Sequence, residues 1–336
     1  MNYKIGIIGC GYWGQNYVRV FRDILNSENV KICDTSKEKL KKILHQYPHV
    51  DTFTDYNELL KNKEISGVVV STPTVDHYSI ARKALINGKH VLVEKPLTTD
   101  VASAKELIGV ARSKKKILMV GHTFIYNSAV RKMKEYINRG EIGRIYYLHS
   151  TRTHLGLIRK DVNVIWDLVP HDVSIFSYLL GKNPLWVSAV GGQFLHKGKE
   201  DIGFITLAYP NGILGNIHVS WIDSNKVREV VIVGSKKRII FDDINNLEKL
   251  RVYEKGVSVE KPIDGFGEWQ YLLRDGDIIS PKIEMSEPLR VQCQHFIDCI
   301  KNSKTCMTDG SSGLNVVKTI VAIEKSIRNN GKAIKV

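Results

Sequence analysis

The sequence predicts an α/β protein with a doubly wound parallel sheet followed by an α+β domain that carries a large, mainly antiparallel sheet. Residues 1 to about 122 alternate short β-branched runs with helical stretches, which is typical of βαβ units. From Ile145 to Tyr253, strand-like runs separated by turns replace this alternation. The length of 336 residues fits about two domains. We therefore expect a first domain over 1–122 and a second over 123–336.

The first domain is expected to contain five strands with helices between them. The strand candidates are Tyr3–Ile8, Val30–Cys33, Gly67–Ser71, His90–Val93 and Ile117–Val120. The helix candidates are Gln15–Ile24, Lys37–His45, Asp76–Asn87 and Ala102–Ser113. The run Val68–Val70 is apolar on both faces, which is typical of a central parallel strand.

The second domain is expected to begin with a helix over Ser128–Asn138, with Asn127 as its N-cap. Its strand candidates are Ile145–Thr153, Trp186–Gln193, Phe204–Ala208, Gly212–Ser220, Glu229–Val233 and Arg238–Phe241. A helix over Val173–Leu180 lies among them, and residues 264–287 look like an irregular loop. The final helices are predicted over Leu289–Asn302 and Gly313–Asn329.

A glycine fingerprint follows the first predicted strand at once. Gly9, Gly11 and Gly14 have the spacing G-x-G-x-x-G and stand between a strand and a helix, where a dinucleotide-binding turn requires them. Gly9 permits the tight turn, Gly11 lets the backbone approach a pyrophosphate, and Gly14 lets helix and strand pack closely. The free N–H groups of the helix N-terminus would bind the phosphates, so the pattern predicts a bound dinucleotide.

Asp34 bears on which dinucleotide binds. It lies about twenty residues after the fingerprint, at the end of the next strand. A carboxylate there can accept hydrogen bonds from the ribose hydroxyls of NAD and would repel a 2′-phosphate. The neighbouring Thr35, Ser36 and Lys37 could hold that phosphate. The sequence therefore favours NAD and leaves NADP open.

Composition narrows the class of protein. With 43% apolar and 25% charged residues, the chain resembles an ordinary globular protein, and no apolar run is long enough to span a membrane. The chain enters a strand without a secretory signal pattern, so we expect a cytoplasmic protein. Its five cysteines lack C-x-x-C spacing, so neither a metal site nor disulfides are expected.

The formal net charge of +14 is spread along the chain. It is consistent with a solvated basic surface or with attraction of anionic substrates or nucleotides. No known nucleic-acid-binding motif supports a nucleic-acid partner.

A lysine follows the fourth predicted strand, in the sequence Glu94-Lys95-Pro96. In an open parallel sheet, ligands bind at the carboxyl ends of the strands, so Lys95 is expected to face the cofactor crevice. Its ammonium group could donate to a substrate hydroxyl or carbonyl and stabilise a developing alkoxide. Pro96 could take either peptide isomer, since the energy gap between isomers is small for an X–Pro bond.

A carboxylate and an imidazole lie four residues apart, at Asp167 and His171. On a helical turn they would share a face. Histidine is a natural proton acceptor when an alcohol is oxidised, and Asp167 could orient substrate or raise the basicity of His171. Pro170 makes a fully regular helix here less favourable, unless it lies in the first turn of the helix that continues to Leu180.

In combination these motifs resemble the Gfo/Idh/MocA family of sugar dehydrogenases and reductases over essentially the full length. The residues that carry the resemblance are Gly9-Cys10-Gly11-Tyr12-Trp13-Gly14, Thr72-Pro73, His77, Glu94-Lys95-Pro96, Gly121-His122, Asn127, Asp167, His171 and Thr308-Asp309-Gly310. The resemblance implies an N-terminal Rossmann domain and a C-terminal domain whose open sheet forms the subunit interface of a homodimer or homotetramer.

The resemblance also implies a catalytic set of Lys95, Asp167 and His171. His171 would take or give the hydroxyl proton while hydride passes between a sugar carbon and nicotinamide C4. The expected cofactor-binding residues are Gly9, Gly11, Tyr12, Trp13, Gly14, Asp34, Ser71, Thr72, Pro73, His77, Glu94 and Lys95. Where many relatives have Arg-Phe after the Gly-His pair, this chain has Ile125 and Tyr126, so only Asn127 is carried over there, as a substrate contact.

A basic segment, Arg152 to Asn163, leads into the Asp167 turn. Arginine holds a diphosphate bidentately, so this segment and the net charge suggest a nucleotide-activated sugar. The expected substrate-binding residues are Lys95, Asn127, Arg152, Arg159, Asn163, Asp167 and His171. The run from Leu157 to Asp172 resembles family members of surface-polysaccharide pathways, which act on the 3-position of sugars such as UDP-N-acetylglucosaminuronate.

Two other functions remain open from the sequence. The same fold could oxidise a free sugar or an inositol-type cyclitol. It could also serve a non-catalytic regulator that senses dinucleotide, although a sensor would have no need of the proton acceptor His171.

Overall fold

The computed structural model describes residues 3–156, 158–159, 161–259 and 271–336. Its contacts divide the chain into two compact units, the first formed by 1–126 with 286–321 and the second by 127–285 with 322–336. The sequence had assigned all of 123–336 to the second domain. Residues 286–321 pack in the first unit, where Gly67, which has no side chain, leaves room for Phe296 and Ile300 of the returning chain.

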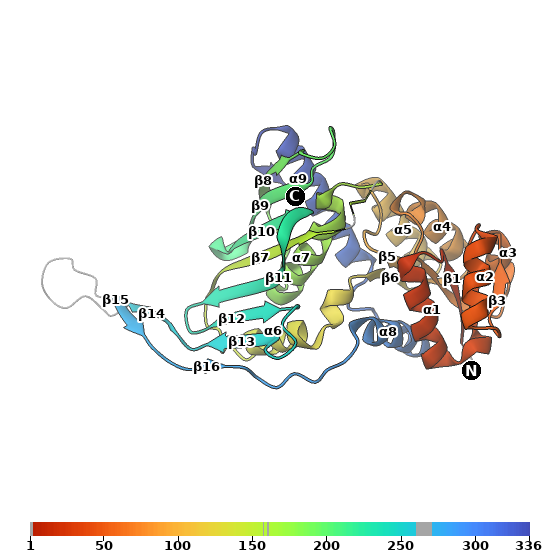
Figure 1. Cartoon of the computed structure of the whole chain (residues 1–336), viewed down its shortest axis with the longest axis horizontal. Coiled ribbons are helices and arrows are strands. Elements are labelled where there is room, and N and C mark those ends of the chain that lie inside the picture. Colours follow the sequence, from red (N-terminus) through yellow and green to blue (C-terminus); the bar gives the residue numbers. More distant parts are fainter. Residues whose placement is uncertain (1–2, 157, 160, 260–270) are drawn as a thin grey trace, which may run out of the picture. The chain divides into compact units, whose positions relative to one another are not determined.

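The first unit contains a six-stranded parallel sheet with the order β3-β2-β1-β4-β5-β6 (Figure 1). Its strands are β1 (Lys4–Ile8), β2 (Val30–Cys33), β3 (Asp51–Phe53), β4 (Ile65–Val70), β5 (His90–Glu94) and β6 (Leu118–Gly121). This order confirms the predicted doubly wound sheet. The order reverses between β1 and β4, and a ligand crevice in such a sheet lies at the carboxyl ends of these two strands.

Among the described residues of the first unit, five helices, α1 to α5, connect these strands, and two more come from the C-terminal part of the chain. They are α1 (Tyr12–Leu25), α2 (Lys37–Gln46), α3 (Tyr56–Lys61), α4 (His77–Ile86), α5 (Val101–Ser113), α8 (Pro288–Asn302) and α9 (Gly310–Arg328), the last of which continues into the second unit. Short 3₁₀ turns lie at Ser27–Asn29, Thr74–Asp76 and Thr123–Tyr126. The sequence prediction missed β3 and α3, which have three and six residues and are too short for a clear hydrophobic period.

The second unit is built on a nine-stranded mixed sheet with the order β16-β13-β12-β11-β7-β10-β9-β8-β17. Its strands are β7 (Ile145–Leu155), β8 (Trp186–Gly192), β9 (Ile202–Ala208), β10 (Leu214–Ser220), β11 (Ile222–Gly234), β12 (Arg238–Asp242), β13 (Leu250–Tyr253), β16 (Ile278–Ile279) and β17 (Ile334–Lys335). Only β7 and β10 pair in parallel, so the expected mainly antiparallel sheet is confirmed.

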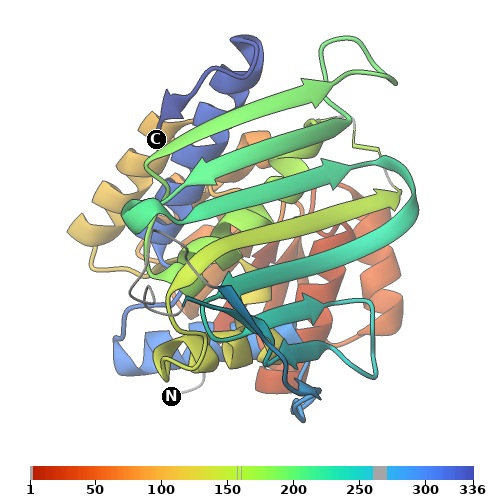
Figure 2. The same ribbon diagram turned by 90° about the vertical axis from the view of Figure 1, so that its left-hand side faces the viewer.

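Helices cover one face of this sheet. They are α6 (Ser128–Asn138), which contacts β12, and α7 (Val164–Leu180), which contacts β7, β9 and β10. Figure 2 looks onto the opposite face, where the strands from β8 to β13 run side by side. Residues alternate along these strands, so that Ile205 and Ile217 are fully buried while Phe204 and Leu214 each expose about half of their surface.

Two predictions in the second unit are wrong. The helix predicted over Val173–Leu180 begins nine residues earlier, at Val164, and contains Pro170. The stretch 264–287 was predicted to be irregular; 264–270 lie outside the described residues, while 271–274 form β15, which pairs with β14 (Gly256–Val259), and 278–279 form β16. Among the helices described, none is long and apolar enough to cross a bilayer.

Candidate active site

The glycine fingerprint forms the turn between β1 and α1. Gly9 has φ +93°, and a Cβ there would lie 2.7 Å from the carbonyl oxygen of Ser71 at the end of β4. A Cβ on Gly14 would lie 1.9 Å from the carbonyl oxygen of Gly9, so helix and turn pack in direct backbone contact. Ser71 completes the turn by donating from its hydroxyl to Gly9 O at 2.8 Å. Both glycines therefore have the steric roles expected of them.

The turn leaves room for an anionic group. A Cβ on Gly11 would meet nothing within 4 Å. Gly11 is also the N-cap of α1, and no described side chain caps the first N–H groups of this helix. Beside Gly9, the buried Oγ1 of Thr72 has no hydrogen-bond partner in the part of the chain that the structure describes. An open cradle, uncapped amides and an orphaned hydroxyl fit the pyrophosphate of a dinucleotide.

Asp34 is held in place by backbone amides. Its Oδ2 accepts from the Cys10 amide at 2.7 Å, and its Oδ1 accepts from the Ser36 amide at 2.8 Å. The carboxylate is 9% exposed, with the Lys39 ammonium 3.6 Å away. Each oxygen retains a lone pair for a ribose hydroxyl. Tyr12 and Trp13, at the start of α1, are the exposed aromatic side chains of this turn.

A buried hydrogen-bond chain, which the sequence did not predict, supports Glu94 at the end of β5. The Tyr17 hydroxyl donates to Glu94 Oε1 at 2.6 Å, and Gln292 Nε2 donates to the Tyr17 hydroxyl at 2.9 Å. Burial and the Glu94 carboxylate raise the pKa of Tyr17 well above its usual value, so the phenol stays protonated as a donor. The other Glu94 oxygen accepts from the Lys95 amide at 3.1 Å, which fixes the backbone from which Lys95 projects.

Lys95 is 8% exposed, and a buried imidazole lies near enough to be affected by its charge. His122, just past β6, is 1% exposed, and burial together with the Lys95 charge lowers its pKa to about 3. Neither ring nitrogen of His122 has a hydrogen-bond partner among the described residues. The sequence marked His122 only as part of a motif, because burial cannot be read from one residue.

His77 ties two loops of the crevice together. Its Nδ1 lies 2.8 Å from the carbonyl oxygen of Pro96, and its Nε2 lies 3.0 Å from that of Thr72. The Lys95–Pro96 peptide bond is cis. Pro73 is exposed in the loop that His77 holds. His77 is 1% exposed, so the geometry favours positioning of the loops at the ends of β4 and β5 over direct contact with a cofactor.

In the second unit, α7 carries Asp167 and His171 four residues apart and on one face, as predicted. Asn163 caps the helix by accepting from the Trp166 amide at 3.1 Å. Its amide nitrogen donates to Glu200 at 2.6 Å. Asn163 therefore stabilises the first turn of α7. This positioning role differs from the predicted substrate contact. Asp167 stands in the first turn, where the helix dipole stabilises a carboxylate.

Arg159 links the basic segment to Asp167. Its guanidinium donates to both Asp161 oxygens, at 3.0 and 2.5 Å, and to Asp167 Oδ1 at 3.2 Å. About a third of its side chain is exposed. Leu157 and Lys160 of the same segment lie outside the described residues. The structure thus connects two of the predicted site residues directly, Arg159 and Asp167.

Arg152 does not fit the predicted role in diphosphate binding. It is 4% exposed and forms a two-pronged ion pair with Asp172, with Nε–Oδ2 at 3.1 Å and Nη2–Oδ1 at 3.0 Å. Asp172 itself is fully buried. The guanidinium neutralises this interior carboxylate, so Arg152 fastens β7 to α7 and is not available to a ligand.

The departure from the family pattern is also visible in the structure. Ile125 and Tyr126 are buried, and the Tyr126 hydroxyl lies 3.0 Å from Thr308 Oγ1. Asn127 caps α6, as predicted, by accepting from the Ala129 amide at 2.9 Å. These residues stabilise local structure, which explains why an apolar and a phenolic side chain are accepted there.

Comparisons with known proteins agree with this architecture. A family model described as an oxidoreductase family with an NAD-binding Rossmann fold (GFO_IDH_MocA) matches residues 3–122, and the GFO/IDH/MocA C-terminal domain matches residues 130–240. The chain is 26% identical over 325 residues to UDP-N-acetylglucosamine 3-dehydrogenase of Acidithiobacillus ferrooxidans, covering 96% of this chain and 97% of that protein. It is 25% identical over 341 residues to scyllo-inositol 2-dehydrogenase (NAD(+)) of Bacillus subtilis, covering 97% and 94%.

Among solved structures, the WlbA dehydrogenase of Bordetella pertussis in complex with NADH and UDP-GlcNAcA has a TM-score of 0.80 at 22% identity, covering 100% of this chain and 99% of that one. Both family domains occur in the expected order, and the first carries the glycine turn described above. The protein therefore belongs to the Gfo/Idh/MocA family of oxidoreductases, with residues 3–122 as its NAD-binding Rossmann domain.

Proposed function

We propose that this oxidoreductase transfers hydride between nicotinamide and the 3-position of a nucleotide-activated sugar, such as UDP-N-acetylglucosaminuronate, in surface-polysaccharide synthesis. The observation that carries this proposal is the similarity over 96% of the chain to a protein named UDP-N-acetylglucosamine 3-dehydrogenase. A second candidate is oxidation of a free cyclitol, because a scyllo-inositol 2-dehydrogenase is similar over 97% of the chain.

The cofactor would be held by the turn at Gly9, Gly11 and Gly14 and by Thr72, with Asp34 at the adenosine ribose. Bound NAD supplies the nicotinamide carbon that accepts or gives the hydride. The Asp34 carboxylate is fixed by two backbone amides and cannot turn away from a 2′-phosphate at low cost. Charge repulsion between Asp34 and a 2′-phosphate supports NAD over NADP. NADP stays an alternative because the Lys39 ammonium, 3.6 Å from Asp34, could pair with that phosphate.

The proton chemistry is assigned to three side chains. His171 would accept the hydroxyl proton in the oxidation direction and return it in reduction. Lys95 would donate a hydrogen bond to the same oxygen and stabilise its developing negative charge. Asp167 would hold the substrate and keep His171 basic, which its place one turn earlier on α7 supports.

Arg159 is proposed to recognise the diphosphate. In the structure its guanidinium is neutralised by Asp161 and Asp167. A diphosphate would replace Asp161 as the acceptor of the two parallel hydrogen bonds that the Arg159 guanidinium donates. This exchange would leave Asp167 less tightly held and available to the substrate, which links recognition of the nucleotide to the catalytic carboxylate.

Substrate class is tested by measuring binding of nucleotide sugars, free sugars and inositols in the presence of NAD. We expect the wild-type protein to bind a UDP- or dTDP-sugar, and Arg159→Ala to weaken that binding roughly tenfold to a hundredfold, as loss of a charge-assisted pair would. Arg139→Ala removes the same charge from an exposed residue just after α6 and serves as the control. Binding of inositol with no effect of Arg159→Ala would favour the cyclitol function.

The catalytic assignment is tested with Lys95→Met. We expect kcat to fall by on the order of a hundredfold or more, because the hydrogen bond to the developing alkoxide is lost. Binding of NAD should change much less. Lys105→Met, an exposed residue of α5, is the matched control. Turnover of Lys95→Met at the wild-type rate would overturn the assignment.

We also propose that the protein is a cytoplasmic homodimer or homotetramer that associates through the open face of the nine-stranded sheet. Neighbouring outward residues on this face are apolar, among them Phe204 and Val190, which pair directly across β9 and β8 and are each about half exposed. Phe204→Asp should lower the mass measured by light scattering to that of a smaller assembly. An unchanged mass would place the interface elsewhere.

A further inference from the structure

The end of α8 and the segment that follows it bring together three side chains that the proposed reaction does not use. His295 and Cys299 lie one helical turn apart on α8, and Cys306 lies in the segment between α8 and α9. One ligand atom from each residue lies within 4.8 Å of the others. The sequence predicted no metal site because the cysteines lack C-x-x-C spacing, whereas a helix places residues i and i+4 side by side.

From this geometry we propose that His295, Cys299 and Cys306 form a binding site for a thiophilic cation of the zinc(II) class. Zinc lies about 2.3 Å from sulfur and about 2.0–2.1 Å from nitrogen, so tetrahedral angles put a sulfur and a nitrogen ligand about 3.6 Å apart. The observed separation of Cys299 Sγ and His295 Nε2 is 3.4 Å. A cation could therefore be bound with small side-chain rotations.

The segment that carries Cys306 is anchored on both sides. Before it, the Lys304 amide donates to the carbonyl oxygen of Cys299 at 3.1 Å. After it, Thr308 donates from its hydroxyl to Val120 O at 2.7 Å, and the Val120 amide donates to Thr308 O at 2.7 Å. Both ends of the segment thus have fixed positions on α8 and β6. Such preorganisation favours binding, because little chain entropy is lost when the ion enters.

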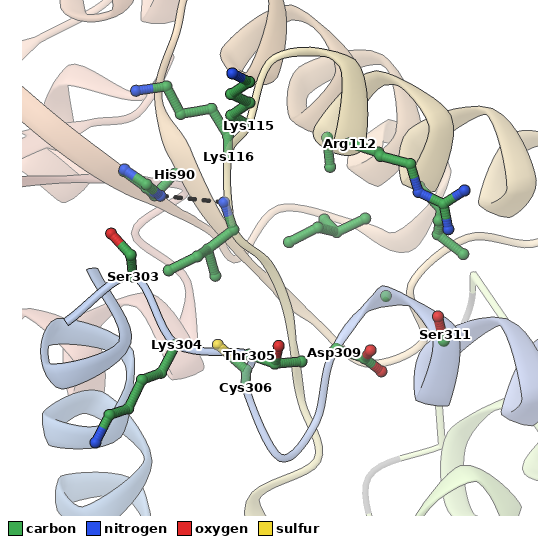
Figure 3. Close-up of a pocket in the computed structure, with 15 residues that line it drawn as sticks. His90, Arg112, Lys115, Lys116, Ser303, Lys304, Thr305, Cys306, Asp309 and Ser311 are labelled. Carbon is green, nitrogen blue, oxygen red and sulfur yellow. Dashed lines mark hydrogen bonds between the residues drawn. The ribbon is translucent and has the colours of Figure 1, made fainter. Parts of the chain in front are cut away.

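Two features describe access to the site. Cys299 and Cys306 are buried, while the His295 ring is partly exposed. Cys306 also lines a pocket of about 420 Å³. Figure 3 shows this pocket, with Cys306 on the same stretch of chain as Thr305 and Asp309. The same pocket is lined by four cationic side chains, Arg112, Lys115, Lys116 and Lys304. They would repel a cation, so the ion would enter from the side of the partly exposed His295. With three protein ligands, the fourth position would be left to water.

Binding requires two rearrangements of the ligands. The thiols must lose their protons to the solvent as the ion binds, since thiolate is the ligand form. The Met307 amide now donates to His295 Nε2 at 3.1 Å and must give up that lone pair. The loss of this hydrogen bond is a cost of binding. Loss of the two protons and of this hydrogen bond lowers the affinity. In the bound state the two negative thiolates neutralise the charge of the divalent cation.

The test uses untagged full-length protein, treated with chelator, kept reduced and titrated with Co²⁺ as a spectroscopic substitute for zinc. We expect one equivalent to bind per chain with thiolate-to-cobalt charge-transfer absorption, and zinc to displace it. Cys306→Ser should weaken cobalt binding at least tenfold. His295→Gln should do the same, and its side-chain oxygen can still accept from the Met307 amide, so its metal-free melting temperature should stay close to wild type.

The matched control is Cys293→Ser, because Cys293 is a buried cysteine of the same helix outside the cluster. It should retain the cobalt absorption. Absence of charge-transfer absorption in the wild-type protein would overturn the proposal, and so would wild-type affinity in both His295→Gln and Cys306→Ser. A disulfide between Cys299 and Cys306 in protein purified without reductant or chelator would assign the pair to redox chemistry and would also overturn it.

Discussion

Three glycines in one turn have three different steric requirements. Gly14 has no space for a methyl group, since its Cβ would lie 1.9 Å from a backbone oxygen. Gly9 combines a close backbone neighbour with φ +93°, where L side chains are strained. Gly11 has neither restriction in the protein alone. Since the protein itself has space for a side chain at position 11, the reason for a glycine there is the close approach of a bound ligand.

This difference predicts opposite behaviour for two alanine variants. Gly11→Ala should change the free energy of unfolding by less than about 0.5 kcal/mol, because the methyl group enters open space. Its affinity for NAD should fall by roughly tenfold or more, because the methyl group occupies the approach of the pyrophosphate. Thermal unfolding and titration with NAD measure the two effects.

Gly14→Ala should instead lower the melting temperature, because the turn must open to admit the new methyl group. Gly109→Ala in α5 is the matched control, since a Cβ there also meets nothing within 4 Å. It should stabilise the protein by up to about 1 kcal/mol through helix propensity. Wild-type affinity for NAD in Gly11→Ala would contradict the predicted position of the pyrophosphate.

At the scale of the elements, a buried charge pair joins α7 to β7 of the sheet. Arg152 comes from β7 and Asp172 from the middle of α7, and both side chains are 5% exposed or less. The helix also has to accommodate Pro170, which lacks an N–H group and leaves one carbonyl of the preceding turn without its usual donor. The ion pair is two residues from Pro170 and fixes the part of α7 that bears His171.

Breaking this pair should therefore destabilise the protein strongly. Arg152→Met leaves the Asp172 carboxylate buried without its partner, so we expect a loss of about 3–5 kcal/mol. The double variant Arg152→Met, Asp172→Leu should recover much of this loss, because it removes both charges. Chemical denaturation measures all three free energies. Equal losses in the single and double variants would show that packing, not charge, dominates at this position.

The elements also show where sequence patterns reach their limit. The strands around the glycine turn were predicted within a residue or two, since β-branched runs bounded by turns are distinctive. The start of α7 was missed because Pro170 is unfavourable inside a helix, while burial of Ile165, Leu168 and Val169 compensates for it. The role of Arg152 was missed because its partner Asp172 lies on another element.

At the scale of the whole molecule, buried histidines link stability to pH. Burial and the nearby Lys95 charge lower the pKa of His122 to about 3, and burial and Lys116 lower the pKa of His90 to about 4. Both rings are neutral in the folded protein at neutral pH. In the unfolded chain they bind a proton near pH 6.5. Between these pH values the unfolded state holds more protons than the folded state. The free energy of unfolding therefore decreases as the pH falls.

We therefore expect the free energy of unfolding to decrease from about pH 6.5 downward, with each histidine contributing up to about 1.4 kcal/mol per pH unit. The contribution of His90 should end near pH 4 and that of His122 near pH 3. His122→Asn should reduce the dependence of the free energy of unfolding on pH, between pH 4 and 6.5, by up to about 1.4 kcal/mol per pH unit. Denaturant titrations over this range measure the slope, and an unchanged slope would contradict the neutral state of His122.

The sequence alone determined the family, the doubly wound sheet, the dinucleotide turn and the four-residue spacing of Asp167 and His171. These features depend on local periodicity and on short motifs, so neighbouring residues are enough to specify them. Only the tertiary structure decided that residues 286–321 return to the first unit, that Arg152 neutralises Asp172, and that His295, Cys299 and Cys306 converge. Each of these depends on pairs of residues far apart along the chain or on separate elements, whose proximity is set by packing and burial and has no local sequence signal.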